Sequence, residues 1–184
     1  MRNTPQASKI VEFWFTPPMS DHWFSSTPDI DYQIFNIYET LWKKAQQGEL
    51  DRWKNDATGC LALCILLDQF PLNMFRGTAK SFSTEQQAVT ISKHAIERKF
   101  DKEIEEEKAA FLYMPLMHSE NLQDQELCVQ SFAQTSLEGN LRFAKHHQDL
   151  IKEFGRFPHR NTMLGRENTP AEIDYLQSDR AFTG

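Results

Sequence analysis

The segment from Gly59 to Phe70 carries apolar or small side chains around its whole circumference, and polar residues enter only in its last turn. A helix with this pattern is stable in water only when other elements surround it, so the segment predicts a central helix that is packed on all sides. Proline lacks a backbone N–H and clashes with the preceding turn, so we expect Pro71 to end the helix. The rest of the chain must therefore fold around this segment.

Helical periodicity extends through most of the remaining sequence. The clearest case begins after Thr27-Pro28, a cap followed by proline at the first helical position, and its apolar residues recur three and four positions apart. Alternating strand patterns with hairpin turns do not occur. We therefore expect an all-α fold of about eight helices in antiparallel pairs, forming a single domain over residues 1–184. The periodic residues of the clearest helix are Ile30, Ile34, Ile37, Tyr38, Leu41 and Ala45.

Charge and composition exclude several classes of protein. The formal net charge is −6, whereas binding a nucleic-acid backbone requires several Lys and Arg side chains on one face. The longest apolar run, Cys60 to Leu67, is shorter than the roughly 18 residues that a membrane span needs. Three cysteines without paired spacing indicate thiols in a reducing compartment. We expect a cytoplasmic protein that binds neither nucleic acid nor membranes, and the sequence contains no motif that predicts a metal or a cofactor.

A charged residue closes the apolar segment, where burial without a partner costs several kcal/mol. Asp68 lies at the C-terminal end of the predicted helix, and the helix dipole disfavours a negative charge there. It therefore needs a cation, and we expect Arg76 or an arginine between Gly155 and Arg166 to supply it through a bidentate contact. The alternative is an ion pair that only ties a loop to the core.

A histidine, a hydroxyl and a carboxylate follow one another at His118-Ser119-Glu120, where another helix is predicted to begin. His118 and Glu120 are candidate acid–base residues, and His147, on the apolar stripe of a later helix, is a third. The alternatives are a helix cap for the first pair and a hydrogen-bonded core histidine for His147. Gln125 faces inward on the same predicted helix, where it either contacts a ligand or bridges two helices.

The loop from Phe154 to Arg166 concentrates hydrogen-bond donors. Between Gly155 and Arg166 there are three arginines and one histidine but no acidic residue. Guanidinium groups match the geometry of carboxylates and of phosphates, so the loop is a candidate anion-binding element. The same donors could instead bind Asp68 and carbonyl groups of the protein itself. These candidate ligand-binding residues are Arg156, His159, Arg160, Asn161 and Arg166.

Distinctive blocks of sequence occupy residues 12–15, 48–53, 67–71, 73–78, 111–120 and 154–166. Together they resemble an uncharacterised bacterial family, the one catalogued as domain of unknown function nine-two-four. The resemblance covers nearly the whole chain and implies an all-helical fold like that of the tetratricopeptide-like superhelices, with no established activity. Carried over by position, it adds Gln69 and Asn73 to the candidate residues. The chain departs from the family pattern at Leu72, where arginine is usual, which weakens the case for an anion site. Two milder departures are Glu85 and Asn168, in place of the more usual aspartate and serine.

We interpret these features as one polar pocket built from distant segments. The pocket binds a small anionic ligand, and His118, Glu120 or His147 does acid–base chemistry on it. The competing hypothesis is a tetratricopeptide-like scaffold of helix pairs that binds a peptide or a protein partner, and a third is a buried ion-pair network without a ligand. The N-terminal aromatics form either an exposed patch or part of the core, and we expect the core. They are Trp14, Phe15, Trp23 and Phe24.

Overall fold

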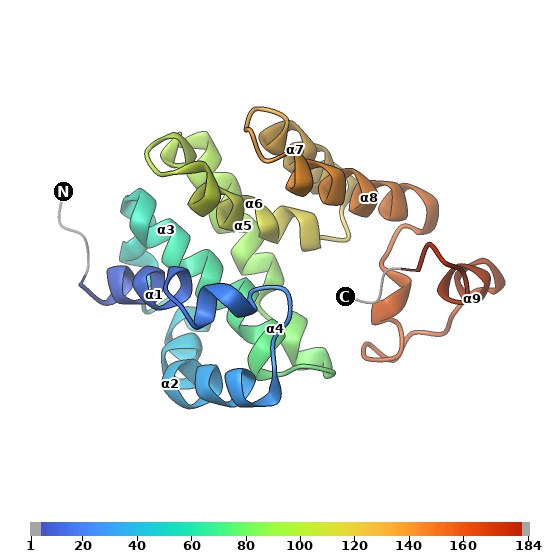
Figure 1. The fold of residues 1–184 in the computed structure, drawn as a ribbon, viewed down its shortest axis with the longest axis horizontal. Coiled ribbons are helices and arrows are strands. Elements are labelled where there is room, and N and C mark those ends of the chain that lie inside the picture. Colours follow the sequence, from blue (N-terminus) through green and yellow to red (C-terminus); the bar gives the residue numbers. More distant parts are fainter. Residues whose placement is uncertain (1–4, 182–184) are drawn as a thin grey trace.

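The computed structural model describes residues 5–181, which form helices and loops without a β-strand (Figure 1). The expectation of an all-α fold is confirmed. The α-helices are α1 (Pro5–Phe15), α2 (Pro28–Gln46), α3 (Ala57–Cys64), α4 (Phe70–Met74), α5 (Glu85–Glu97), α6 (Glu106–His118), α7 (Leu122–Phe132), α8 (Glu138–Phe154) and α9 (Pro170–Leu176). Short 3-10 helices are η1 (Met19–His22), η2 (Asp51–Asn55), η4 (Ala79–Phe82), η5 (Phe100–Lys102) and η6 (Pro158–Arg160), and η3 (Ile65–Gln69) is a π-helical turn.

The central helix does not end at Pro71, contrary to the sequence-based expectation. Elements α3, η3 and α4 form one continuous helix from Ala57 to Met74, and counting it once gives eight α-helices in residues 5–181. The π turn and the side chain of Thr84 accommodate the proline within the helix. Pro71 has no N–H for the carbonyl of Leu67, one helical turn earlier, and the Thr84 hydroxyl donates to that carbonyl instead, at 2.6 Å.

Other helices surround this central helix. Helices α1, α5 and α6 pack on α3, and α2 packs on α4. The segment Ala57–Met74 is long and apolar enough to cross a membrane, but 83% of it is buried inside the protein. Because it is buried, this segment is the core helix that its sequence predicts.

The N-terminal aromatic residues mostly belong to the core. Trp14 is buried against the rings of Phe70 and Phe111, and Trp23 is half-buried with its ring centroid 4.8 Å from that of Phe111. Phe15 is half-buried in the same group. Phe24 is the exception, because its side chain is 78% exposed, so the expectation of core packing is wrong for this residue.

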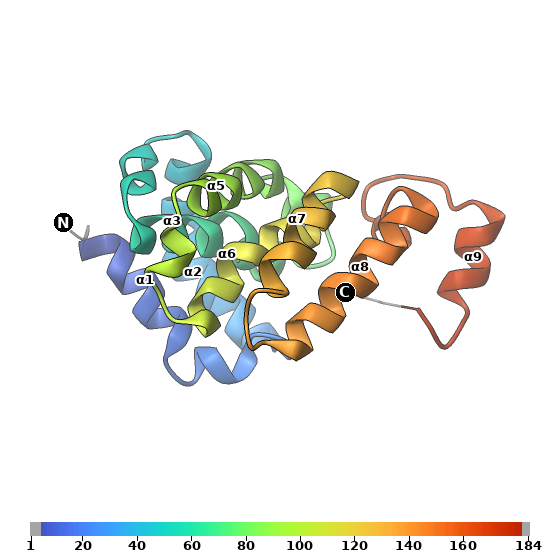
Figure 2. The same cartoon turned by 90° about the horizontal axis from the view of Figure 1, so that it is seen from above.

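The C-terminal part has a small core of its own. Helix α8 packs along α7, and Figure 2 shows α8 and α9 at the end of the molecule away from α1. Leu150, Ile151, Phe157 and Tyr175 are buried together, apart from the main cluster of buried apolar residues. Polar contacts also join the two cores, as described next.

Candidate functional site

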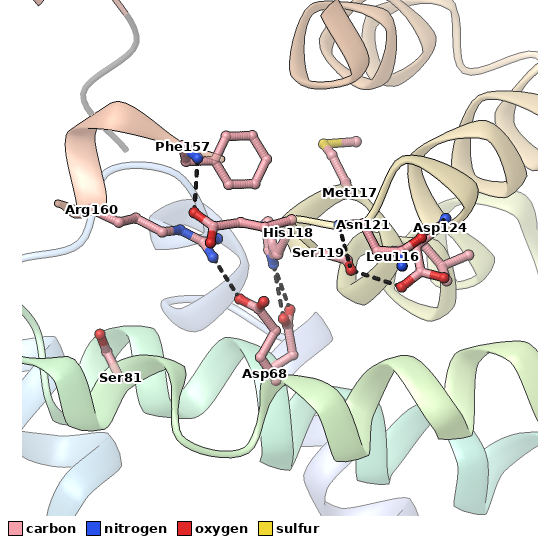
Figure 3. Close-up of polar contacts among 12 residues, drawn as sticks. Asp68, Ser81, Leu116, Met117, His118, Ser119, Asn121, Asp124, Phe157 and Arg160 are labelled. Atoms are coloured by element: carbon pink, nitrogen blue, oxygen red, sulfur yellow. Dashed lines mark hydrogen bonds and ion pairs between the residues drawn. The ribbon is translucent and has the colours of Figure 1, made fainter. Parts of the chain in front are cut away.

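Asp68 and His118 form a partly buried contact at the centre of the candidate site (Figure 3). The Nδ1 atom of His118 lies 2.8 and 3.0 Å from the two carboxylate oxygens of Asp68. The amide of Gln69 donates to the same carboxylate at 2.6 Å. Asp68 is 4% exposed. The sequence correctly indicated that Asp68 needs a partner. That partner is His118, so the prediction of an arginine is wrong.

The backbone around this contact explains how the two side chains meet. Asp68 and Gln69 lie in the π turn, whose wider winding is common at functional sites. His118 is the last residue of α6, because the chain becomes extended at Ser119. Gln125 holds that end in place: its amide donates to the carbonyls of Met117 and Ser119, both at 2.7 Å. Gln125 is fully buried, so the structure supports the helix-bridging interpretation of this residue.

A second carboxylate and an arginine lie beside Asp68. Glu85, in the first turn of α5, accepts a hydrogen bond from Arg160 at 2.9 Å. The side chain of Arg160 is 6% exposed, and its Cζ lies 4.5 and 4.7 Å from the ring centroids of Phe82 and Phe157. Burial raises the pKa of Glu85 to about 7, and the negative charge of Asp68 adds to this, although Arg160 and His118 oppose it. Glu85 is a site residue that the sequence analysis missed.

A third carboxylate holds the C-terminal loop. Glu120 accepts two hydrogen bonds from Arg166, at 2.6 and 2.9 Å, and one from the backbone N–H of Phe157, at 2.8 Å. Burial alone would raise the pKa of Glu120, but these bonds stabilise the carboxylate and lower the pKa overall. Asn161 orients the arginine, since its side-chain oxygen accepts from Arg166 Nε at 2.9 Å.

Two histidines, His147 and His159, lie beside Phe157. Burial lowers the pKa of His147 to about 3 and that of His159 to about 4, so both are neutral at pH 7. The ring centroids of His147 and His159 lie 5.4 and 5.7 Å from the ring centroid of Phe157. The Nδ1 atom of His147 lies 2.8 Å from the carbonyl oxygen of Phe143. This placement matches the interpretation of His147 as a hydrogen-bonded core histidine.

Residues 10–180 match the family model described as "Bacterial protein of unknown function (DUF924)". The chain belongs to this family. It is also similar to a solved structure, described as a protein of unknown function, ATU0120, from Agrobacterium tumefaciens, with 37% sequence identity and a TM-score of 0.87. The similarity covers 94% of this chain and 97% of that one. No curated protein matches. The resemblance inferred from the sequence blocks is confirmed.

In this DUF924 protein the predicted site residues separate into one large group and two small ones. Asn73 and Arg76 both bind Asp31, each with a contact of 2.7 Å. Arg156 binds Glu172, at 2.6 and 2.8 Å, next to the capping box of α9. The remaining ion pairs form one junction, which we call the Asp68 cluster: Asp68, Gln69, Glu85, His118, Glu120, Arg160 and Arg166.

The Asp68 cluster is buried at its centre and open at its edge. The side chains of Asp68 and Arg160 are 3% and 6% exposed, whereas those of Glu85 and His118 are each 20% exposed. A cavity of about 620 Å³ lies elsewhere in this DUF924 protein, with Phe15, Trp23 and Glu107 among its lining residues, and it shares none of them with the cluster. We locate the candidate site at the Asp68 cluster because buried charged groups from distant segments converge there.

Proposed function

We propose that His118 is a general base held by Asp68, and that the Asp68 cluster binds and acts on a small anionic ligand. The contact between the Asp68 carboxylate and His118 Nδ1 carries this proposal. An ionised carboxylate only accepts hydrogen bonds, so Nδ1 holds the hydrogen and the lone pair of the neutral ring lies on Nε2. Within residues 5–181, Nε2 has no hydrogen-bond partner, and His118 reaches solvent. Nε2 is therefore placed to take a proton from a ligand.

Glu85 is the complementary acid in this proposal. A carboxyl group with a pKa of about 7 is half protonated at neutral pH and can donate. It is close enough to His118 for the two groups to interact electrostatically. A proton donor and a proton acceptor placed side by side are typical of sites that pass a proton to and from a ligand.

The balance of charge also supports proton chemistry. The cluster contains three carboxylates, on Asp68, Glu85 and Glu120, against the two guanidinium groups of Arg160 and Arg166. With all carboxylates ionised and His118 neutral, it carries one excess negative charge. One added proton balances it, so the cluster is suited to exchanging a single proton with a ligand.

The first test is the tautomer of His118, measured by nitrogen-15 NMR on protein labelled at histidine. We expect hydrogen on Nδ1 and a proton-accepting Nε2. A neutral His118 with its hydrogen on Nε2 would contradict the proposal, because Asp68 would then be the protonated partner. His22, in η1 and outside the cluster, provides the reference signal.

The second test is a thermal-unfolding screen against small carboxylates and phosphate esters. We expect at least one to stabilise the wild-type protein, and we expect His118→Asn to lose that response while the matched variant His22→Asn keeps it. Equal responses from both variants would contradict the role of His118. If the cluster is only an ion-pair network, no compound acts, and Asp68→Asn and Arg160→Ala each cost roughly 3–5 kcal/mol.

The alternative function is a tetratricopeptide-like scaffold for a peptide or protein partner, and specific exposed side chains favour it. Phe24 and Tyr32 are 78% and 69% exposed. Large exposed aromatics of this kind are common in binding surfaces. Replacing both with serine should abolish capture of a partner from a lysate if this function is correct, and should leave ligand-induced stabilisation unchanged.

We also propose a cytoplasmic location. Cys60, Cys64 and Cys128 are all buried thiols without a disulfide, as expected in a reducing compartment. Cell fractionation with a specific antibody tests this, and recovery from the periplasm would contradict it.

A further inference from the structure

The guanidinium of Arg160 is firmly held but incompletely bonded. Its Nη1 atom donates to one oxygen of Glu85, at 2.9 Å, in a contact with a single hydrogen bond. Its Nε atom is buried and has no hydrogen-bond partner within residues 5–181. Other buried donors without a partner in these residues include Trp14 Nε1 and Trp53 Nε1, but Arg160 Nε is the one that belongs to a guanidinium, and an unpaired buried donor calls for an explanation. Arg166, by contrast, forms two hydrogen bonds with Glu120 and one with Asn161.

Glu85 is the carboxylate that contacts Arg160, and it lies at the edge of the cluster. Its side chain begins in the first turn of α5 and is 20% exposed, so one side of it faces solvent. Only its Oε2 atom accepts a hydrogen bond from the described residues. A carboxylate that is not tied to the backbone of its helix could align both oxygens with the guanidinium, which Glu85 does not do.

We propose that Arg160 recognises a carboxylate group of the ligand, and that this group replaces the carboxylate of Glu85. The inference rests on the proposed function, because it assigns the ligand class for the same site. In the exchange the ligand arrives as a carboxylate, Glu85 leaves Arg160, and Glu85 takes one proton from solvent. The total charge of the Asp68 cluster, ligand included, is then unchanged.

Charge favours a carboxylate over a phosphate. Asp68 and Glu120 remain in the cluster beside Arg160, and their charges oppose any further negative charge. A single carboxylate replaces the charge that Glu85 gives up. A phosphate group carries about −1.5 to −2 at pH 7, so it would add uncompensated charge next to Asp68. The rings of Phe82 and Phe157 beside the Arg160 guanidinium also favour a flat partner group.

Displacing Glu85 is easier than displacing Glu120. The pKa of Glu85 is raised to about 7, so its protonation at neutral pH requires little free energy. The pKa of Glu120 is lowered, and its three hydrogen bonds would all be lost. Arg166 is therefore the fixed member of the cluster, and Arg160 is the one available to a ligand.

The sharpest test is rescue of Glu85→Ala by acetate. This substitution removes a CH2–COO⁻ group, which acetate restores almost atom for atom. We expect the variant to unfold at a lower temperature than wild type, and we expect acetate to reverse most of the loss. At ten times its dissociation constant, acetate raises the folded-to-unfolded ratio about elevenfold. Chloride at equal ionic strength and acetamide should have little effect, and phosphate should act less than acetate.

A second measurement uses a variant that keeps the shape of the side chain. Calorimetric titration of wild-type protein with acetate, in HEPES and in Tris at pH 8, should show net proton uptake on binding. Glu85→Gln should bind acetate without proton uptake. This calorimetric comparison of wild type with Glu85→Gln remains informative if Glu85→Ala fails to fold.

The outcomes separate this inference from the proposed function. Equal effects of acetate and chloride on a folded Glu85→Ala, stronger rescue by phosphate, or the same proton uptake in Glu85→Gln as in wild type would overturn the carboxylate assignment. Acetate rescue that persists while His118→Asn leaves every ligand response unchanged would instead support the carboxylate site and refute His118 as its base.

Discussion

Replacing His147 with phenylalanine should change how the stability of the protein depends on pH. His147 is 5% exposed, and its ring packs against Phe157. Burial lowers its pKa to about 3, from 6.5 in the unfolded chain. Below pH 6.5 the unfolded chain therefore binds a proton that the folded protein does not bind. The folded state loses stability as the pH falls through this range, and phenylalanine at this position removes that loss.

The size of the effect follows from the two pKa values. At pH 5 the unfolded histidine is 1.5 units below its pKa of 6.5, while the folded one is still neutral. Each unit corresponds to about 1.4 kcal/mol, so His147 should cost the wild-type protein about 2 kcal/mol between pH 7 and pH 5. Glu85 acts in the opposite direction, because a carboxyl with a raised pKa gains stability as the pH falls from 7 towards 4.5. The pH dependence of the wild-type free energy of unfolding therefore does not reveal the contribution of either group alone.

The difference between wild type and variant isolates His147. Urea unfolding, followed by tryptophan fluorescence at pH 7 and pH 5, gives the free energy of unfolding of each protein. We expect the difference between them to shift by about 2 kcal/mol in favour of His147→Phe at pH 5. His22→Phe, in η1, is the control for replacing a half-buried histidine with phenylalanine. Parallel profiles for His147→Phe would refute the reasoning that a buried neutral imidazole occupies this position.

Three further changes have definite expected outcomes. Thr84→Val removes the hydroxyl that donates to the Leu67 carbonyl, so it should lower the free energy of unfolding in urea by roughly 1–3 kcal/mol. An unchanged free energy would show that another group donates to this carbonyl. Glu120→Gln should lower it by roughly 2–3 kcal/mol at pH 7. Because the pKa of Glu120 is lowered, wild type begins to lose this advantage as the pH falls below 4.5, and a penalty that is undiminished at pH 3 would contradict the assignment. Arg156→Ala should make α9 sensitive to limited proteolysis without changing the main unfolding transition, and an uncut α9 would count against its role there.

The sequence predicted the helices better than their ends. Periodicity and caps identify the elements, because they depend on residues close together in the chain. The prediction failed at Pro71, where a helix was expected to stop. The missing hydrogen bond is made by Thr84, which lies 17 positions from Leu67, and no local pattern reveals that contact. Phe143 shows the same limit: it lies four positions before His147, on the apolar stripe of that predicted helix, but its side chain is 58% exposed. A local pattern does not show which part of a stripe the other elements cover.

The sequence also identified most members of the Asp68 cluster, but not their pairing. Burial of a charged residue can be predicted from its apolar neighbours, and this is how Asp68 became a candidate. The choice of partner is a property of the folded chain. Arg76 was a reasonable partner for Asp68 by distance in sequence, yet it binds Asp31, 45 positions away. Glu85 was noted only as a departure from the family pattern and not as a site residue, since an acid in the first turn of a helix is ordinarily explained by the helix dipole.

The position of the Asp68 cluster gives it two roles that must be compatible. Phe157 belongs to the small C-terminal core, and its N–H binds Glu120 beside the main core, so the cluster also joins the two parts of the fold. A ligand that broke these contacts would loosen that junction. A ligand carboxylate that replaces only Glu85 keeps Arg160 paired and leaves the Glu120–Arg166 contact intact. Exchange at Glu85 is thus the form of ligand binding that the junction tolerates with the least loss of stability.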